Sequence, residues 1–208
     1  MQKAIMTRSE SGAARSRADS TREKILNTAA ACFLENGYRD TRMMQIAARC
    51  GLSRAAIYKH FPTKESVLLA LNARVVEDTL AVTHFILNSR QPALKVIEQW
   101  MRDLLSHDQP GFIRVVMIDD AQGVLMLDQE ATDDALRKVK RALTKVIRRG
   151  VREGDVAPNI HPADTAHMLQ ALVFSIERNN LSSRPVIEMR DSRRQDLMIA
   201  TIIAGLRA

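Results

Sequence analysis

The sequence predicts an all-α protein of about nine helices, with a small N-terminal helix-turn-helix domain followed by a larger C-terminal helical domain. Alanine, leucine, arginine and methionine are abundant in the 208 residues, and only 6 prolines and 8 glycines interrupt them. Apolar side chains recur at helical spacing from residue 20 onward. Capping residues and helix stops separate these apolar stretches.

The first predicted helix begins at Ser20, because Ser20 and Glu23 have the spacing of a capping box. An apolar stripe follows, and Asn36-Gly37 ends the helix, with Gly37 in the left-handed conformation. Residues 1–19 are rich in Ser, Ala, Arg and Gly and show little periodicity, so we expect a flexible basic leader there.

Residues 41–61 predict two short helices joined by a tight turn. Thr41 is the expected N-cap of a helix over 42–50, and Gly51 supplies the positive φ that the turn needs. Ser53 is the expected N-cap of a helix over 54–60, which Pro62 ends. Together with the Ser20–Asn36 helix, these elements define a helix-turn-helix domain over residues 20–62.

Residues 63–208 predict a second, larger helical domain. Thr63 can cap a long helix that runs to about Phe85. The remaining pattern predicts helices over about 92–106, 110–126, 130–150, 164–180 and 192–207.

The positive charge is concentrated in the N-terminal third of the chain. Residues 1–62 hold 11 Lys and Arg against 5 Asp and Glu, whereas residues 63–208 hold 20 against 19. This asymmetry predicts a polyanionic partner, double-stranded DNA, for the first third alone. A signal-peptide core and an apolar run long enough to span a bilayer are both absent from the sequence, so we expect a cytoplasmic protein without a membrane partner.

Catalytic and metal-binding motifs are absent from the sequence. It contains no GxSxG, no HExxH and no glycine-rich phosphate loop, so we expect no enzyme and no cofactor. Cys32 and Cys50 lack a partner at metal-ligand spacing, which predicts two buried thiols and no metal site.

The helix over 54–60 is the predicted reading element, since a helix fits the major groove of DNA. Arg54 can donate to a guanine edge, and small side chains beside it allow close approach to the bases. The predicted DNA-binding residues are Thr41, Arg42, Met44, Ser53, Arg54, Ala55, Ala56, Tyr58, Lys59, His60 and Lys64.

Residues 21–68 resemble the DNA-binding domain of the tetracycline-repressor (TetR) family. The resemblance rests on Gly51-Leu52-Ser53, on Ile57-Tyr58-Lys59-His60-Phe61 and on Lys64-Glu65. It implies that Tyr58, His60 and Lys64 hold phosphates, and that Arg54 and Ala55 face the bases. Arg42, Met44, Gln45 and Ala55 depart from the residues usual in the family, and most of them lie on the surface that would choose the bases.

The resemblance also implies a homodimer, which places two reading helices on successive turns of the major groove. The last two predicted helices are richer in apolar residues than a single buried stripe requires. The predicted dimer residues are Leu169, Leu172, Val173, Ile176, Ile199, Ile202 and Ile203.

Residues 80–180 offer soft methionines and aromatic rings that can line an adaptable apolar pocket. The predicted pocket residues are Phe85, Trp100, Met101, Phe112, Met117, Met168, Phe174 and Glu177. The sequence therefore predicts a transcriptional regulator, a repressor that a small hydrophobic or amphipathic effector releases from a palindromic operator. An activator, a protein-sensing regulator with the same reading head and a non-specific architectural DNA-binding protein are the alternatives.

Overall fold

The computed structural model describes residues 2–105, 129–181 and 191–208, and these residues form eight helices. Side-chain positions are described from Asp19 onward, except at 177, 180 and 181. The helices are α1 (Gln2–Asn36), α2 (Met43–Cys50), α3 (Arg54–His60), α4 (Lys64–Asn88), α5 (Ala93–Leu105), α8 (Gln129–Glu153), α9 (Pro162–Leu181) and α10 (Ser192–Leu206). No strand occurs in these ranges, and only an isolated bridge joins Val156 to Arg207. The protein is therefore all-α, as predicted.

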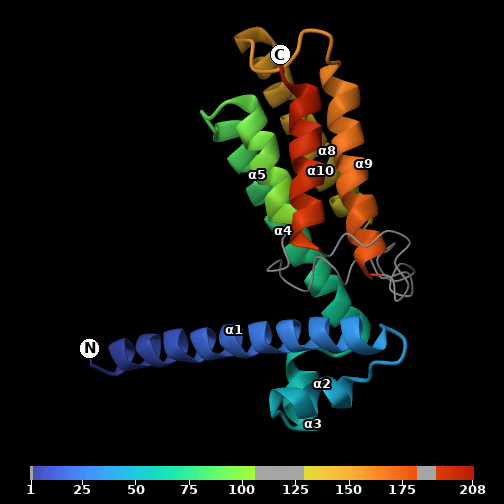
Figure 1. The fold of residues 1–208 in the computed structure, drawn as a ribbon. Coiled ribbons are helices and arrows are strands. Elements are labelled where there is room, and N and C mark those ends of the chain that lie inside the picture. Colours follow the sequence, from blue (N-terminus) through green and yellow to red (C-terminus); the bar gives the residue numbers. More distant parts are fainter. Residues whose placement is uncertain (1, 106–128, 182–190) are drawn as a thin grey trace.

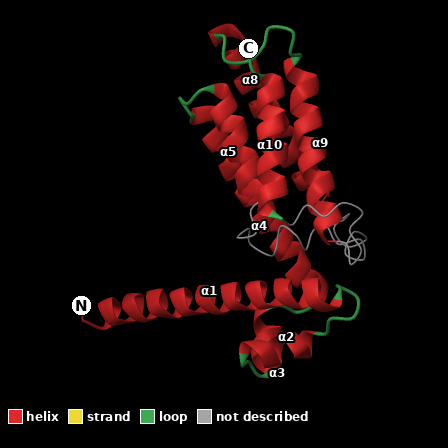
Figure 2. Ribbon diagram, in the orientation of Figure 1, coloured by secondary structure: helices red, strands yellow, loops and turns green. Residues whose placement is uncertain are grey.

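Two groups of helices make up the molecule (Figure 1). We call α1, α2, α3 and the start of α4 the head, and the rest of α4 with α5, α8, α9 and α10 the bundle. α1 lies across the foot of the bundle, α2 and α3 lie beneath α1, and α4 rises from the head into the bundle. The green loops in Figure 2 are short, so helix packing positions most of the described residues.

Each group of helices has its own apolar core. In the head, buried side chains of all four helices meet, including Phe33 of α1, Ile46 of α2, Ile57 of α3 and Leu68 of α4. The bundle core is a separate cluster, built mainly on α5, α8, α9 and α10. Cys32 and Cys50 are free thiols buried in the head core. None of the described helices combines the length and apolarity that crossing a bilayer requires.

The predicted start of the first helix is wrong. α1 begins at Gln2, so Ser20 lies inside the helix and is exposed rather than capping an end. Glu23, the other half of the expected capping box, instead pairs with Arg74 of α4. This ion pair joins α1 to the helix that leaves the head.

The two glycine turns and the cap at Thr63 lie where the sequence predicts them. Gly37 and Gly51 have φ of 81° and 67°, and Thr63 caps α4 by accepting a hydrogen bond from the Ser66 amide at 3.1 Å. α4 continues three residues past Phe85, to Asn88. The helix expected over 110–126 lies outside the described residues.

Candidate functional site

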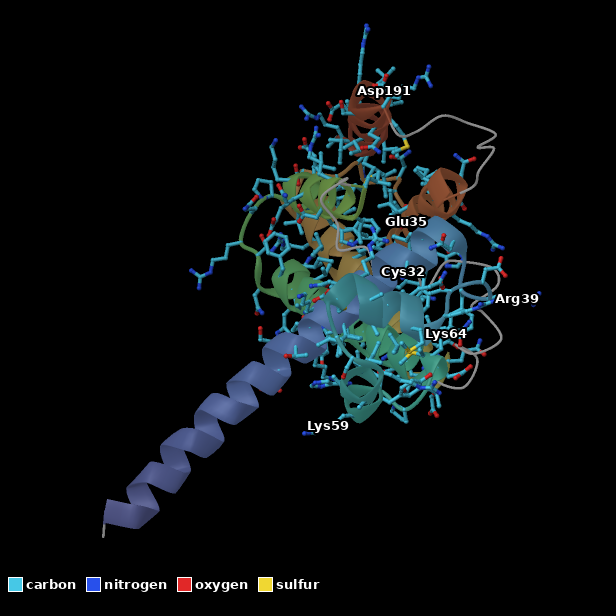
Figure 3. The ribbon with its side chains drawn as sticks, turned by 90° about the horizontal axis from the view of Figure 1, so that it is seen from below. Cys32, Glu35, Arg39, Lys59, Lys64 and Asp191 are labelled. Carbon is cyan, nitrogen blue, oxygen red and sulfur yellow. The ribbon has the colours of Figure 1, made fainter. Side chains whose placement is uncertain are left out.

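The exposed face of the head is built on α3. Ile57 anchors this helix in the head core, and Ser53 caps it by accepting a hydrogen bond from the Ala56 amide at 3.2 Å. Arg54, Ala55, Tyr58 and Lys59 are exposed, whereas Ala56 and His60 are half-buried. The Arg54 guanidinium lies 5.8 Å from the centre of the Tyr58 ring, and Figure 3 shows Lys59 extending away from the head.

Arg42, just before α2, and Met44, in α2, are both exposed on the head. The start of α2 differs from the prediction: Arg42 is the N-cap residue, and its amide donates to the Gln45 side chain at 2.6 Å. Thr41 does not cap α2. Its buried hydroxyl lies 2.7 Å from the Gly37 carbonyl oxygen and 3.1 Å from that of Cys32, and so helps to satisfy carbonyls at the end of α1.

Lys64, at the start of α4, is held by the loop that precedes α2. Its ammonium donates to the carbonyl oxygens of Tyr38 at 2.6 Å, Arg39 at 3.0 Å and Thr41 at 2.9 Å. The same nitrogen lies 4.4 Å from the centre of the Tyr38 ring. Lys64 therefore tethers α4 to the 38–41 loop. The sequence predicted only a phosphate contact for this residue and not the tether. Its contact with phosphate stays a prediction.

A second tether sets the position of α2 against α1. Arg49 forms a bidentate pair with Glu35, with nitrogen–oxygen distances of 2.5 and 2.8 Å. Hydrogen bonding to Arg49 holds the pKa of Glu35 below its usual range. The pair links the first two helices at the surface of the head, while the buried core sets how they cross.

The bundle contains a pocket of about 610 Å³ between α4, α5, α8 and α9, which we call the bundle pocket. Three predicted residues, Phe85, Trp100 and Phe174, line it. The other described lining residues are Val75, Val76, Asp78, Thr79, Ala81, Val82, Asp103, Leu104, Thr132, Ala135, Leu136, Val139 and Gln170. The sequence does indicate that the lining residues of α4 share one face of the helix. Their spacing is three or four residues: Val75, Asp78, Thr79 and Val82.

The remaining predicted pocket residues lie elsewhere or outside the description. Met101 is fully buried in the bundle core, and Met168 is 54% exposed on α9; neither lines the bundle pocket. Phe112 and Met117 lie outside the described residues, as does the side chain of Glu177.

The predicted dimer residues point mostly into their own subunit. Leu169, Leu172, Val173, Ile176, Ile199, Ile202 and Ile203 belong to the bundle core or pack against it, with only Leu172 and Ile202 partly exposed. Among the described side chains of α9 and α10, the large apolar ones that are exposed are Met168 and Leu197, the latter 68% exposed. The sequence pattern identified two apolar helices but not which of their sides is free.

The described residues contain no group of three or more His, Cys, Asp or Glu side chains arranged to hold a metal ion.

Comparisons with known proteins agree with this architecture. Residues 25–71 match the model of "Bacterial regulatory proteins, tetR family". The HTH-type transcriptional regulator RutR of Escherichia coli (strain K12) is 33% identical over 162 residues, covering 76% of this chain and 74% of RutR. In the SmeT–triclosan complex, SmeT aligns with a TM-score of 0.67 and 25% identity over 91% of this chain and 92% of SmeT.

A second solved structure supports the fold alone. AibR, crystallised with isovaleryl coenzyme A and operator DNA, aligns with a TM-score of 0.66 and 19% identity over 87% of this chain and 97% of AibR. The exposed α3 face, the matched residues 25–71 and the extent of the RutR alignment lead to one conclusion. The chain belongs to the tetR family of bacterial regulatory proteins and is a DNA-binding transcriptional regulator, not an enzyme.

Proposed function

We propose that this chain is a repressor that binds a palindromic operator as a homodimer and leaves it when a small hydrophobic or amphipathic molecule fills the bundle pocket. The observation that carries the proposal is that α4 belongs to both parts: it begins in the head core and then forms one wall of the pocket. A ligand that changes the packing of α4 therefore changes the position of the head.

The DNA contacts that we propose follow from exposure. Arg54, Ala55 and Tyr58 face the base edges and phosphates from α3, and Lys59 reaches the phosphate backbone. Arg42 and Met44 extend the contact from α2, while Ser53 caps the reading helix. Thr41 and Lys64 act by shaping the loop between α1 and α2, in addition to any phosphate contact of Lys64.

The homodimer that we propose uses the exposed sides of α9 and α10. Met168 and Leu197 are the large apolar side chains there, and the exposed Ala171, Ala200 and Ala204 beside them allow close helix packing. A second copy of the chain would cover this exposed apolar surface and remove it from water, which stabilises the dimer, as in the homodimers of the family.

Replacing Leu197 with Glu should convert the dimer to a monomer, because a charge at the centre of an apolar interface loses its hydration. Analytical ultracentrifugation of the full chain measures the change, and Ser192→Glu at the exposed start of α10 is the control. A dimer that keeps its dissociation constant after L197E places the interface elsewhere.

The link between pocket and head that we propose is a hydrogen bond between α4 and α8. Asn72 is buried directly after Leu71 of the head core, and its side-chain amide donates to the Thr132 hydroxyl at 3.0 Å. Thr132 also lines the bundle pocket. A ligand that displaces Thr132 therefore acts directly on the junction between head and bundle.

Replacing Thr132 with Val removes the hydroxyl and keeps the side-chain shape, so we expect operator binding to persist while release by the effector weakens. Fluorescence anisotropy of labelled operator, titrated with effector, measures both. Thr144→Val is the matched control, because the Thr144 hydroxyl donates within α8, to the Lys140 carbonyl at 2.8 Å, and does not line the described part of the bundle pocket. An unchanged effector response in T132V would remove this bond from the mechanism.

Two of the alternative functions share the same head. An activator binds the operator more tightly with its effector, and a protein-sensing regulator responds to no small molecule. A non-specific architectural protein is disfavoured because the bundle carries nearly balanced charge.

Release of DNA tests the proposal. The chain is first bound to the genomic fragment that it retains most tightly at physiological salt, and a library of hydrophobic and amphipathic compounds is then screened for loss of the complex. Release by a compound that also raises the melting temperature of the protein supports a ligand-controlled repressor. A library without effect on either measurement contradicts it.

A further inference from the structure

Two carboxylates stand in the apolar wall of the bundle pocket. Asp78 comes from α4 and is half-buried, and Asp103 comes from α5 and is exposed. The other polar side chains among the described lining residues are Thr79, Thr132 and Gln170, which are neutral. Lys, Arg and His are absent from the described part of the lining, so the known wall of the pocket is negatively charged.

Among the described residues, little besides the charge of Arg74 stabilises the negative charge of Asp78. No described residue donates a hydrogen bond to it, and burial raises its pKa, with Glu77 adding to the rise and Arg74 opposing it. The opposing charge of Arg74 is itself paired with Glu23 of α1. A carboxylate that has lost part of its hydration without gaining a partner is stabilised by a bound cation.

Asp103 is placed differently. Its carboxylate accepts a hydrogen bond from the Gln99 side chain at 2.6 Å, one turn earlier on α5. Because it is exposed, solvent screens its charge more than that of Asp78. We therefore expect Asp103 to attract a cation from solvent, and Asp78 to hold it.

Aromatic rings complete the lining. Phe85, Trp100 and Phe174 lie in the wall, and an aromatic face attracts a cation. Trp100 is 2% exposed, and its indole nitrogen has no hydrogen-bond partner among the described residues.

We infer that the bundle pocket takes an apolar organic cation, whose charge is held by Asp78 and by the aromatic rings and whose hydrocarbon part fills the space between α4 and α8. This inference rests on the proposed function and names the chemical class of its effector. A neutral amphiphile brings no counter-charge to the half-buried carboxylate of Asp78. An anionic amphiphile adds like-charge repulsion to the cost of burying its own charge.

Three probe molecules separate these cases: decyltrimethylammonium, 1-decanol and decanoate. They share a flexible alkyl tail and differ in the charge of the polar group at its end. Trp100 is the only tryptophan of the sequence, so its fluorescence reports binding at the pocket itself. The full-length dimer should bind the cation at least about tenfold more tightly than the alcohol, which corresponds to about 1.4 kcal/mol. Decanoate should bind more weakly than the alcohol.

Asp78→Asn should remove most of this preference while leaving the affinity for 1-decanol unchanged, and Asp103→Asn should reduce it less. Glu77→Gln is the matched control, because Glu77 is the exposed neighbour of Asp78, carries the same charge and does not line the pocket. It should keep the preference.

The outcomes separate this inference from the proposed function. Binding of 1-decanol or decanoate as tightly as the cation, a preference that survives D78N, or binding of none of the three probes overturns the cationic effector. The proposed function still stands in each case if another compound releases the protein from DNA. It fails if no compound in the library does so.

Discussion

Replacing Ala55 with Glu should abolish specific DNA binding without unfolding the protein. Ala55 is exposed on α3, next to Arg54 and on the outer face of the head, so a longer side chain meets no core atom there. A carboxylate on this face opposes the DNA phosphates and blocks close approach to the base edges. We expect the affinity for the operator to fall by at least about a hundredfold. A single base-reading contact is worth about 1–3 kcal/mol, and the substitution removes such a contact in both heads of the dimer.

Anisotropy titration of labelled operator measures this loss, and thermal denaturation verifies that the variant is folded. Ala131→Glu is the control, because it makes the same change at an exposed position near the start of α8, in the bundle. It should bind the operator as the unmodified chain does. Equal affinity of A55E and A131E would show that α3 is not the reading helix.

Replacing Phe33 with Ala should unfold the head while the bundle stays folded. The Phe33 side chain is fully buried where α1 meets the other head helices, and its ring stacks edge-on against Tyr38 with centroids 5.3 Å apart. Truncating a buried phenylalanine costs about 3–5 kcal/mol, a large share of the stability of a small domain. The bundle core shares none of the residues of the head core, so it keeps its own packing.

Two spectroscopic signals distinguish the two parts. Trp100 belongs to the bundle core, so its fluorescence transition should stay near the unmodified temperature, while part of the helical circular dichroism is lost earlier and operator binding disappears. Phe85→Ala is the control, because Phe85 is 42% exposed and its truncation leaves a smaller gap. A single transition of both signals at a lower temperature would show that head and bundle unfold as one unit.

Local signals predicted the head because its geometry depends on few residues. The turn at Gly51 needs a positive φ, and the caps at Ser53 and Thr63 need a hydroxyl three residues before an amide. These requirements are met within a few residues of chain and are therefore visible in the sequence.

The same kind of signal failed at Ser20 and Thr41 for physical reasons. A capping box marks the start of a helix only if the residues before it are not helical themselves. Residues 2–19 contain no proline, one glycine and several alanines, so α1 includes them. The Thr41 hydroxyl donates to a carbonyl at the end of α1 instead of capping α2. At the start of α2, the Gln45 side chain accepts a hydrogen bond from the Arg42 amide.

The bundle pocket and the free side of α9 were harder to predict, because both depend on how distant helices rotate against each other. Neighbouring residues of a helix differ by about 100° in direction, which leaves Met168 exposed beside the fully buried Leu169. Aromatic content identified Phe85, Trp100 and Phe174, but only the packing of α4 against α8 brings Asp78 and Thr132 into the same wall.

Selection of bound duplexes from a random pool tests the central claim most directly. The full chain is mixed with random DNA at physiological salt, and the retained duplexes are sequenced. We expect one inverted repeat whose halves lie about 34–36 Å apart, the spacing of two reading helices on successive major-groove turns. Retained duplexes that share no sequence, and that A55E retains equally well, would contradict a sequence-specific regulator.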